Sequence, residues 1–116
     1  MTATISSHIL NGVNGTHAGG IKVRLINLIT GIIMFDKETD PNGRLVHALD
    51  LADFDPKSRY EIIFETGRYW QQLGESHPQI TEEIVLRFAM PSPSARYHIP
   101  FIISPNSYTT WWSQPE

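Results

Sequence analysis

One stretch near the end of the chain carries residue types that could do chemistry on a rigid support. Residues 96–104 read Arg-Tyr-His-Ile-Pro-Phe-Ile-Ile-Ser, and the odd-numbered positions are all apolar. Because side chains alternate between the two faces of a strand, these positions are expected to face a core and His98 to point the other way. An imidazole can act near neutral pH as a base, an acid or a hydrogen-bond donor. The pattern indicates either a site at His98 or an ordinary surface histidine on a half-exposed strand.

Further residues would share a face with His98 if the chain turns back after residue 104 as a second strand. The residues of suitable parity on the two strands are both polar and apolar: Pro100, Ile102, Thr109, Trp111 and Ser113. Trp112 has the opposite parity, so it either lines the same site or packs into the interior of the fold. Two indoles near an imidazole predict a pocket that binds a small molecule through apolar area as well as hydrogen bonds.

Length and composition restrict the class of protein. The chain has 116 residues, of which 41% are hydrophobic and 18% charged, which predicts one globular domain over residues 1–116. The net charge is -3 and no basic run is present, so a nucleic-acid partner is not expected. Cysteine is absent, which excludes disulfides and thiolate chemistry. The five histidines show neither His-x-His nor His-x-x-x-His spacing, so we predict no metal and no cofactor.

No apolar run approaches the length that spans a membrane, and the first residues lack the basic and apolar regions of a signal peptide. We therefore expect a soluble, cytoplasmic protein with no membrane partner.

Short alternating segments separated by turn signals follow one another along the chain. The expected strands cover residues 5–11, 21–28, 32–36, 45–50, 59–65, 82–90 and 96–104, followed by the segment that carries Trp111. One helix is expected over residues 66–74, with Thr66 as its cap, Gly74 as its end, and Tyr69, Trp70 and Leu73 on one apolar side. This order predicts an all-β protein, an antiparallel β-sandwich with one short helix. Bare edge strands favour assembly into an oligomer.

Four stretches, in order and at compatible spacing, resemble the transthyretin / 5-hydroxyisourate hydrolase family. They are Ser7-His8-Ile9-Leu10, Gly43-Arg44, Tyr69-Trp70-Gln71-Gln72-Leu73-Gly74, and Arg96-Tyr97-His98-Ile99-Pro100 with Ser104-Pro105. The similarity runs from Ser7 to the C-terminus. It implies a transthyretin-like eight-stranded β-sandwich that assembles as a homotetramer, a dimer of dimers. It also implies sites in a channel at the dimer–dimer interface.

The resemblance assigns catalytic roles to three residues. His8, Arg44 and His98 fall on the two histidines and the arginine of the hydrolase branch, whereas transthyretin itself lacks all three. Their presence places the chain on the enzyme side of the family. Leu10 shares a strand face with His8. The expected substrate-binding residues are therefore Leu10, Pro100, Ile102, Thr109, Trp111, Trp112 and Ser113.

The end of the chain departs from the hydrolase pattern. Where the hydrolases read Ser-Thr-Tyr-Arg-Gly-Ser, this sequence reads Thr109-Thr110-Trp111-Trp112-Ser113-Gln114. Trp111 replaces the tyrosine and Trp112 the arginine, which removes charge stabilisation and adds apolar area. Arg96 replaces the first histidine of the family's His-Tyr-His. It is either a rim charge or a substitute for the lost tail arginine.

These changes favour an enzyme repurposed for an apolar, carbonyl-bearing small molecule. The specific hypothesis is an intramolecular [4+2] cyclisation in secondary metabolism, a step that relatives in fungal natural-product clusters perform. Hydrogen bonds from the histidines and Arg44 would activate a carbonyl, and tryptophan walls would fold the substrate. One alternative is hydrolysis of 5-hydroxyisourate or a related cyclic amide. Another is a non-catalytic ligand carrier, as transthyretin is.

Other residues of chemical interest have simpler interpretations. Three histidines lie in or near expected loops, where a solvated side chain is the default: His17, His47 and His77. Trp70 on the expected helix is a core residue by default. Lys22 and Arg24 are most simply the solvated face of a strand.

Overall fold

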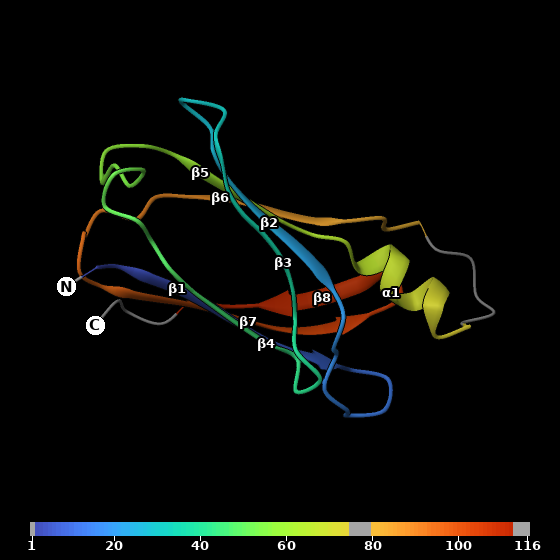
Figure 1. Cartoon of the computed structure of the whole chain (residues 1–116). Helices are drawn as coiled ribbons and strands as arrows, with labels where there is room; N and C mark the ends of the chain where they lie inside the picture. Colours follow the sequence, from blue (N-terminus) through green and yellow to red (C-terminus); the bar gives the residue numbers. More distant parts are fainter. Residues whose placement is uncertain (1, 75–79, 113–116) are drawn as a thin grey trace.

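The computed structural model describes residues 2–74 and 80–112, which form two four-stranded sheets and one short helix (Figure 1). The first sheet has the order β4-β1-β7-β8 and the second has the order β3-β2-β5-β6. The strands are β1 Thr4–Asn11, β2 Lys22–Asn27, β3 Ile33–Glu38, β4 Arg44–Ala48, β5 Tyr60–Phe64, β6 Ile84–Phe88, β7 Arg96–Ser104 and β8 Ser107–Thr110. The predicted eight-stranded sandwich with one short helix is confirmed.

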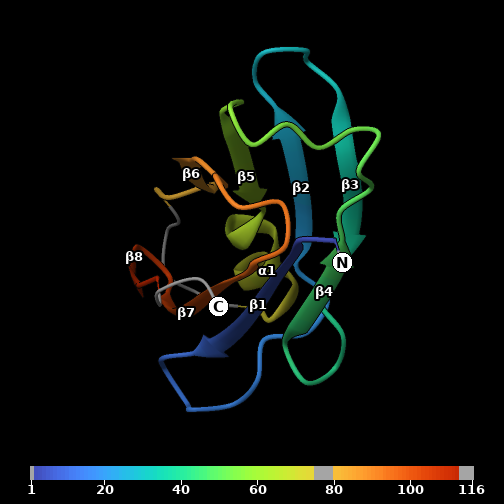
Figure 2. The ribbon, with the colours of Figure 1, turned by 90° about the vertical axis from the view of Figure 1, so that its left-hand side faces the viewer.

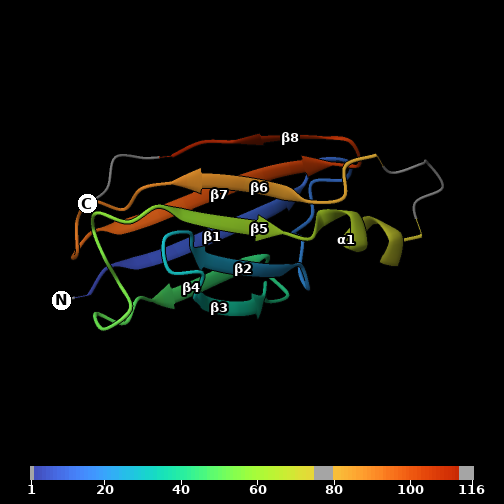
Figure 3. The ribbon, with the colours of Figure 1, turned by 90° about the horizontal axis from the view of Figure 1, so that it is seen from above.

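The strand order of both sheets can be followed in Figure 3. All neighbouring strands are antiparallel except β1 and β7, which run parallel in the middle of the first sheet. The expectation of a purely antiparallel sandwich is wrong at this one pair. The side chain of Ser7 is buried at the pair and donates a hydrogen bond to the carbonyl of Ile99 (2.6 Å), which adds to the ladder.

The core lies between the two sheets, which Figure 2 shows as separate layers. The expected alternation in β7 is confirmed, since none of its four core-facing side chains is more than 3% exposed: Tyr97, Ile99, Phe101 and Ile103. Phe101 meets Phe64 of the opposite sheet with ring centroids 4.5 Å apart. Burial of each such side chain is worth about 1.5–3 kcal/mol, so this interface holds the outer face of the first sheet rigid.

Helix α1, Thr66–Gln72, follows β5 at one end of the sandwich (Figure 1). Its N-cap is Glu65, without a side-chain capping bond, so the assignment of Thr66 as the cap is wrong. The predicted end is confirmed, because Gly74 has a φ of 73°, which favours glycine. Tyr69 and Trp70 are buried, but Leu73 lies beyond the last helical residue and is 52% exposed. Helix α1 has seven residues and is too short to cross a membrane, and it is the longest helix among the described residues.

Two strand boundaries near the expected site differ from the prediction. Strand β4 begins at Arg44, one residue early, which makes Arg44 a strand residue paired with His8. Strand β8 ends at Thr110, so Trp111 and Trp112 lie outside any strand, and Ser113 lies outside the described residues. The reason is Pro100, which would be the next partner on β7 and has no N–H for the ladder. The hydroxyl of Thr110 instead donates to the carbonyl of Pro100 (2.9 Å).

Candidate functional site

The outer face of the first sheet brings two histidines and one arginine together from three adjacent strands. His8 on β1 is paired with Arg44 on β4, and the same residue of β1 is level with Pro100 on β7. His98 is paired with Ser6, two residues before His8 and on the same face. Adjacent strands lie about 4.8 Å apart, so the three side chains are close neighbours. The structure thus places His8, Arg44 and His98 in one group.

The ring of His98 is fixed by a hydroxyl on the neighbouring strand. Its Nδ1 lies 2.8 Å from Oγ of Ser6, and both side chains are half-buried on the outer face. Burial lowers the pKa of His98 below its ordinary value, and the positive charge of Arg44 lowers it further. The imidazole is therefore neutral near pH 7, as a general base has to be.

His8 is held by a second imidazole. Its Nε2 lies 3.0 Å from Nδ1 of His17, close enough for a hydrogen bond. Burial is the main cause that lowers the pKa of His8, followed by the charges of Arg44 and His17, with a smaller effect of His98. A hydrogen bond at the backbone of Asn42 opposes these effects. Two other imidazoles and a guanidinium thus lower the pKa of His8 on this face.

His17 is exposed and lies in a loop, as its sequence context predicts, but it also lies on this face beside His8, which the sequence does not predict. The loop after β1 runs back along it, and His17 forms an isolated β-bridge with Leu10. Two backbone hydrogen bonds fix this return, from Ala18 to Ile9 (2.9 Å) and from Asn11 to Thr16 (2.8 Å). Nothing in the residue pattern marks such a pairing, because the loop carries no alternation of its own.

A tight turn sets the position of Arg44. Oδ1 of Asp40 accepts hydrogen bonds from the backbone N–H groups of Asn42 and Arg44, both at 2.9 Å. Gly43 has a φ of 72°, and a Cβ there would collide with the carbonyl oxygen of Ile9. Because that carbonyl belongs to β1 next to His8, only glycine lets the turn approach the site so closely.

The remaining expected binding residues surround this group unevenly. Leu10 is half-buried on the face of His8, Pro100 is buried, and Ile102 is 40% exposed beside its partner Thr109. Trp111 follows β8 and is 49% exposed. Trp112 contacts Phe88 of the second sheet with ring centroids 5.0 Å apart, so its ring packs across the edge of the sandwich.

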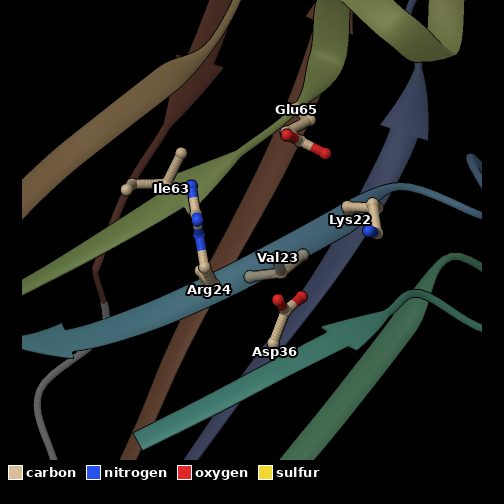
Figure 4. A pocket seen from close by; sticks show the side chains of 6 residues that line it. All are labelled: Lys22, Val23, Arg24, Asp36, Ile63 and Glu65. Carbon is tan, nitrogen blue, oxygen red and sulfur yellow. The ribbon is translucent and has the colours of Figure 1, made fainter. Parts of the chain in front are cut away.

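A small hollow lies on the outer face of the second sheet (Figure 4). Its lining is of mixed charge: Lys22, Val23, Arg24, Asp36, Ile63 and Glu65. It contains no imidazole, so it is less suited to acid–base chemistry near pH 7 than the face with His8 and His98. Residues 2–74 and 80–112 contain no group of three or more histidine or acidic side chains arranged to hold a metal ion.

Comparison with known proteins agrees with this fold. The sequence model described as the HIUase/Transthyretin family matches residues 5–112. A Pseudomonas aeruginosa protein named 5-hydroxyisourate hydrolase is 31% identical, with 92% of this chain and 88% of the relative aligned. The structure of Klebsiella pneumoniae 5-hydroxyisourate hydrolase superposes with a TM-score of 0.78 at 26% identity, covering 96% of this chain and 99% of that one. Sea bream transthyretin in complex with thyroxine gives a TM-score of 0.80 at 26% identity, covering 94% and 93%.

Proposed function

Because the chain belongs to the HIUase/transthyretin family, we propose that it hydrolyses 5-hydroxyisourate or a closely related cyclic amide. The observation that carries this proposal is the grouping of His8, Arg44 and His98 on one rigid sheet face. The nearly full-length similarity to proteins named 5-hydroxyisourate hydrolase supports the same reaction.

These relatives contradict the [4+2] cyclisation that the tail residues suggested. The hypothesis gave too much weight to the replacement of the tail tyrosine and arginine by Trp111 and Trp112. Those changes lie beyond the end of β8, and Trp112 packs on Phe88. The histidines and Arg44 are held by β1, β4 and β7, which the changed tail leaves intact.

His98 is the general base of the proposed reaction. Its Nδ1 is occupied by Ser6, which leaves Nε2 for a water molecule beside the substrate. The lowered pKa keeps the ring neutral, so it can take a proton as water adds to the ring carbonyl. The carbonyl carbon becomes tetrahedral and its oxygen becomes an oxyanion.

Arg44 and His8 complete the ring opening. The guanidinium stabilises the negative charge on the oxygen, since it carries a permanent positive charge and several N–H donors. The carbonyl then re-forms and the carbon–nitrogen bond breaks. The electron pair of that bond goes to the ring nitrogen, which takes a proton from His8. The product is an acid in which the attacked ring is open; His98 takes one proton from water and His8 gives one to the nitrogen, so the protons balance.

The other residues of the face would form the walls of the substrate site. They are Leu10, Pro100, Ile102, Thr109 and Trp111, whereas the ring of Trp112 packs on Phe88. A flat heterocycle can stack on an indole, and its amide groups can meet the imidazoles and Arg44. In this proposal the wall residues provide the affinity for the substrate, and the two histidines and Arg44 provide the acceleration of the reaction.

The reaction itself is the direct test. Freshly generated 5-hydroxyisourate decays slowly in buffer, and we expect the protein to accelerate the loss of its ultraviolet absorbance in proportion to enzyme concentration. Heat-denatured protein is the control. If the native protein leaves the decay unchanged at micromolar concentration, hydrolysis of 5-hydroxyisourate is excluded.

We also propose that the chain is a homotetramer, a dimer of dimers, with this face at the dimer–dimer interface. The face exposes apolar side chains that a monomer would leave in water, since Val46 is 66% exposed and Ile102 is 40% exposed. The similarity to transthyretin supports the same assembly.

Light scattering should give four times the 13.2 kDa mass of one chain. Val46→Glu places a charge on the face and is expected to lower that mass. Ile29→Glu is the matched control, because Ile29 is 71% exposed on the turn between β2 and β3 and should leave the mass unchanged. A monomeric wild type would contradict the proposal.

A further inference from the structure

The loop between β1 and β2 supplies a third imidazole to the face that carries His8 and His98. Nδ1 of His17 lies 3.0 Å from Nε2 of His8, with ring planes 25° apart and ring centroids 5.2 Å apart. Rings so spaced meet edge to edge, as an N–H···N hydrogen bond requires. We propose that His17 is a positioning residue that shares one proton with His8, so that the two imidazoles act as a single proton donor.

The backbone, and not the side chain alone, places His17 there. The pairing of β1 with β4 reaches as far as His8 and Arg44, where β4 begins. Beyond that point, the bridge from His17 to Leu10 pairs the loop with β1. Asn14 holds the loop through hydrogen bonds from the N–H and hydroxyl of Thr16 (3.0 and 2.6 Å). Since the ring of His17 is exposed on its other side, it connects the half-buried His8 to solvent.

The two nitrogens that face each other can hold only one hydrogen comfortably. If both rings are neutral, one donates its N–H to the lone pair of the other. If one ring is protonated, the same hydrogen bond becomes charge-assisted and stronger. If both are protonated, two N–H groups point at each other and two positive charges repel. The pair therefore binds a first proton readily and resists a second.

The side chains around the pair oppose a second proton. Arg44 from β4 and His98 from β7 are the other titratable or charged side chains that influence His8, and both oppose additional positive charge. The backbone hydrogen bond at Asn42, in the turn before β4, favours the protonated form of His8. Arg44 and His98 therefore disfavour a doubly protonated pair of His8 and His17.

This inference rests on the proposed hydrolysis for its role in the reaction. The departing ring nitrogen needs a proton, yet burial and Arg44 lower the pKa of His8, which would leave an isolated His8 mostly deprotonated. Sharing with His17 keeps one proton at the pair. After His8 gives that proton to the nitrogen, water restores it through the exposed ring of His17.

The first test needs no substrate, so its outcome is independent of the proposed function. The imidazoles of the full-length protein are titrated by NMR as wild type and as His17→Asn. Asparagine keeps a hydrogen-bonding group near the position of Nδ1 but cannot bind a proton. In the wild type we expect His8 to titrate in two steps shared with His17. In the variant we expect one step. Its pKa should be higher than that of the wild-type step at lower pH, at which the pair takes up its second proton, because the neighbouring charge is gone.

Identical titration curves of His8 in both proteins would overturn the proposal. The matched control is His47→Asn, which removes an imidazole that packs on Phe35 (ring centroids 4.8 Å apart), away from the outer face. It should leave the curve of His8 unchanged. A shift as large as that of His17→Asn would show a general charge effect and would also overturn the pairing.

The second test is kinetic and uses 5-hydroxyisourate. In His17→Asn we expect kcat to fall by about tenfold near pH 7, less than the loss of a general acid itself, because His17 acts only through His8; KM should be nearly unchanged. The loss should grow with rising pH, because the lone His8 loses its proton first. His47→Asn should keep wild-type kinetics. If His17→Asn has a wild-type pH profile, the shared proton has no role in turnover. If the wild-type protein itself is inactive, the proposed function fails while the titration still decides the pairing.

Discussion

His98→Ala is expected to lower kcat for 5-hydroxyisourate by about 10²-fold to 10⁴-fold, the usual contribution of a positioned general base. The substitution removes the nitrogen that takes the proton from water, and no other described side chain lies at the same place on β7. The ring contributes little to the apolar walls, so KM should change much less than kcat. Absorbance decay followed by stopped flow over a range of substrate concentrations separates the two constants.

Two further variants distinguish chemistry from binding. Ser6→Ala keeps the imidazole of His98 but removes the partner of its Nδ1. We expect kcat to fall by about fivefold, which corresponds to a net hydrogen bond of about 1 kcal/mol.

Trp111→Ala leaves every titratable group in place, so we expect a higher KM with little change in kcat. If His98→Ala retains the kcat of the wild type, His98 is not the base and the proposed mechanism is wrong.

The sequence predicted the position of His98 because a strand has a simple period. Four apolar residues at alternate positions in 96–104 can only face the core, so the residue between Tyr97 and Ile99 must face outward. The same reasoning placed His8 on one face of β1. Arg44 came from the resemblance, and the structure adds that the turn at Gly43 brings it beside β1.

The parts that the sequence did not predict depend on pairing between distant segments. The end of β8 follows from its register with Pro100, which alternation within either strand does not reveal. The position of His17 beside His8 follows from a loop that returns along β1. Trp112 meets Phe88 of the other sheet, a contact between residues 24 positions apart in the chain. Local patterns carry no information on such contacts, so the sequence of the tail does not reveal that Trp112 packs on Phe88.

Arg44→Ala is expected to change both the height and the position of the pH–rate profile. Loss of the guanidinium removes the main stabilisation of the oxyanion, for which a cost of about 10²-fold to 10³-fold in kcat is typical. The positive charge of Arg44 also lowers the pKa values of His8 and His98. Both pKa values should therefore rise in the variant.

The direction of the shift follows from the two roles. The base His98 works when neutral, so the acidic limb of the profile lies at its pKa and should move to higher pH. The donor His8 works when it is protonated, so the alkaline limb of the profile lies at its pKa. This limb should move to higher pH as well. NMR titration of the two rings, with kcat/KM measured over the same pH range, checks both limbs.

Arg44→Lys separates the charge from the shape of the group. A lysine keeps the positive charge, so the profile should stay near its wild-type position. It presents a compact ammonium instead of a planar fork, so part of the rate should still be lost.

Arg87→Ala is the matched control, since Arg87 pairs with Glu61 on the second sheet (3.0 Å) and its loss should alter neither the rate nor the profile. A residue that only bound substrate would lower the profile without moving it. An unshifted profile in Arg44→Ala would therefore refute the electrostatic role of Arg44, even if the rate fell.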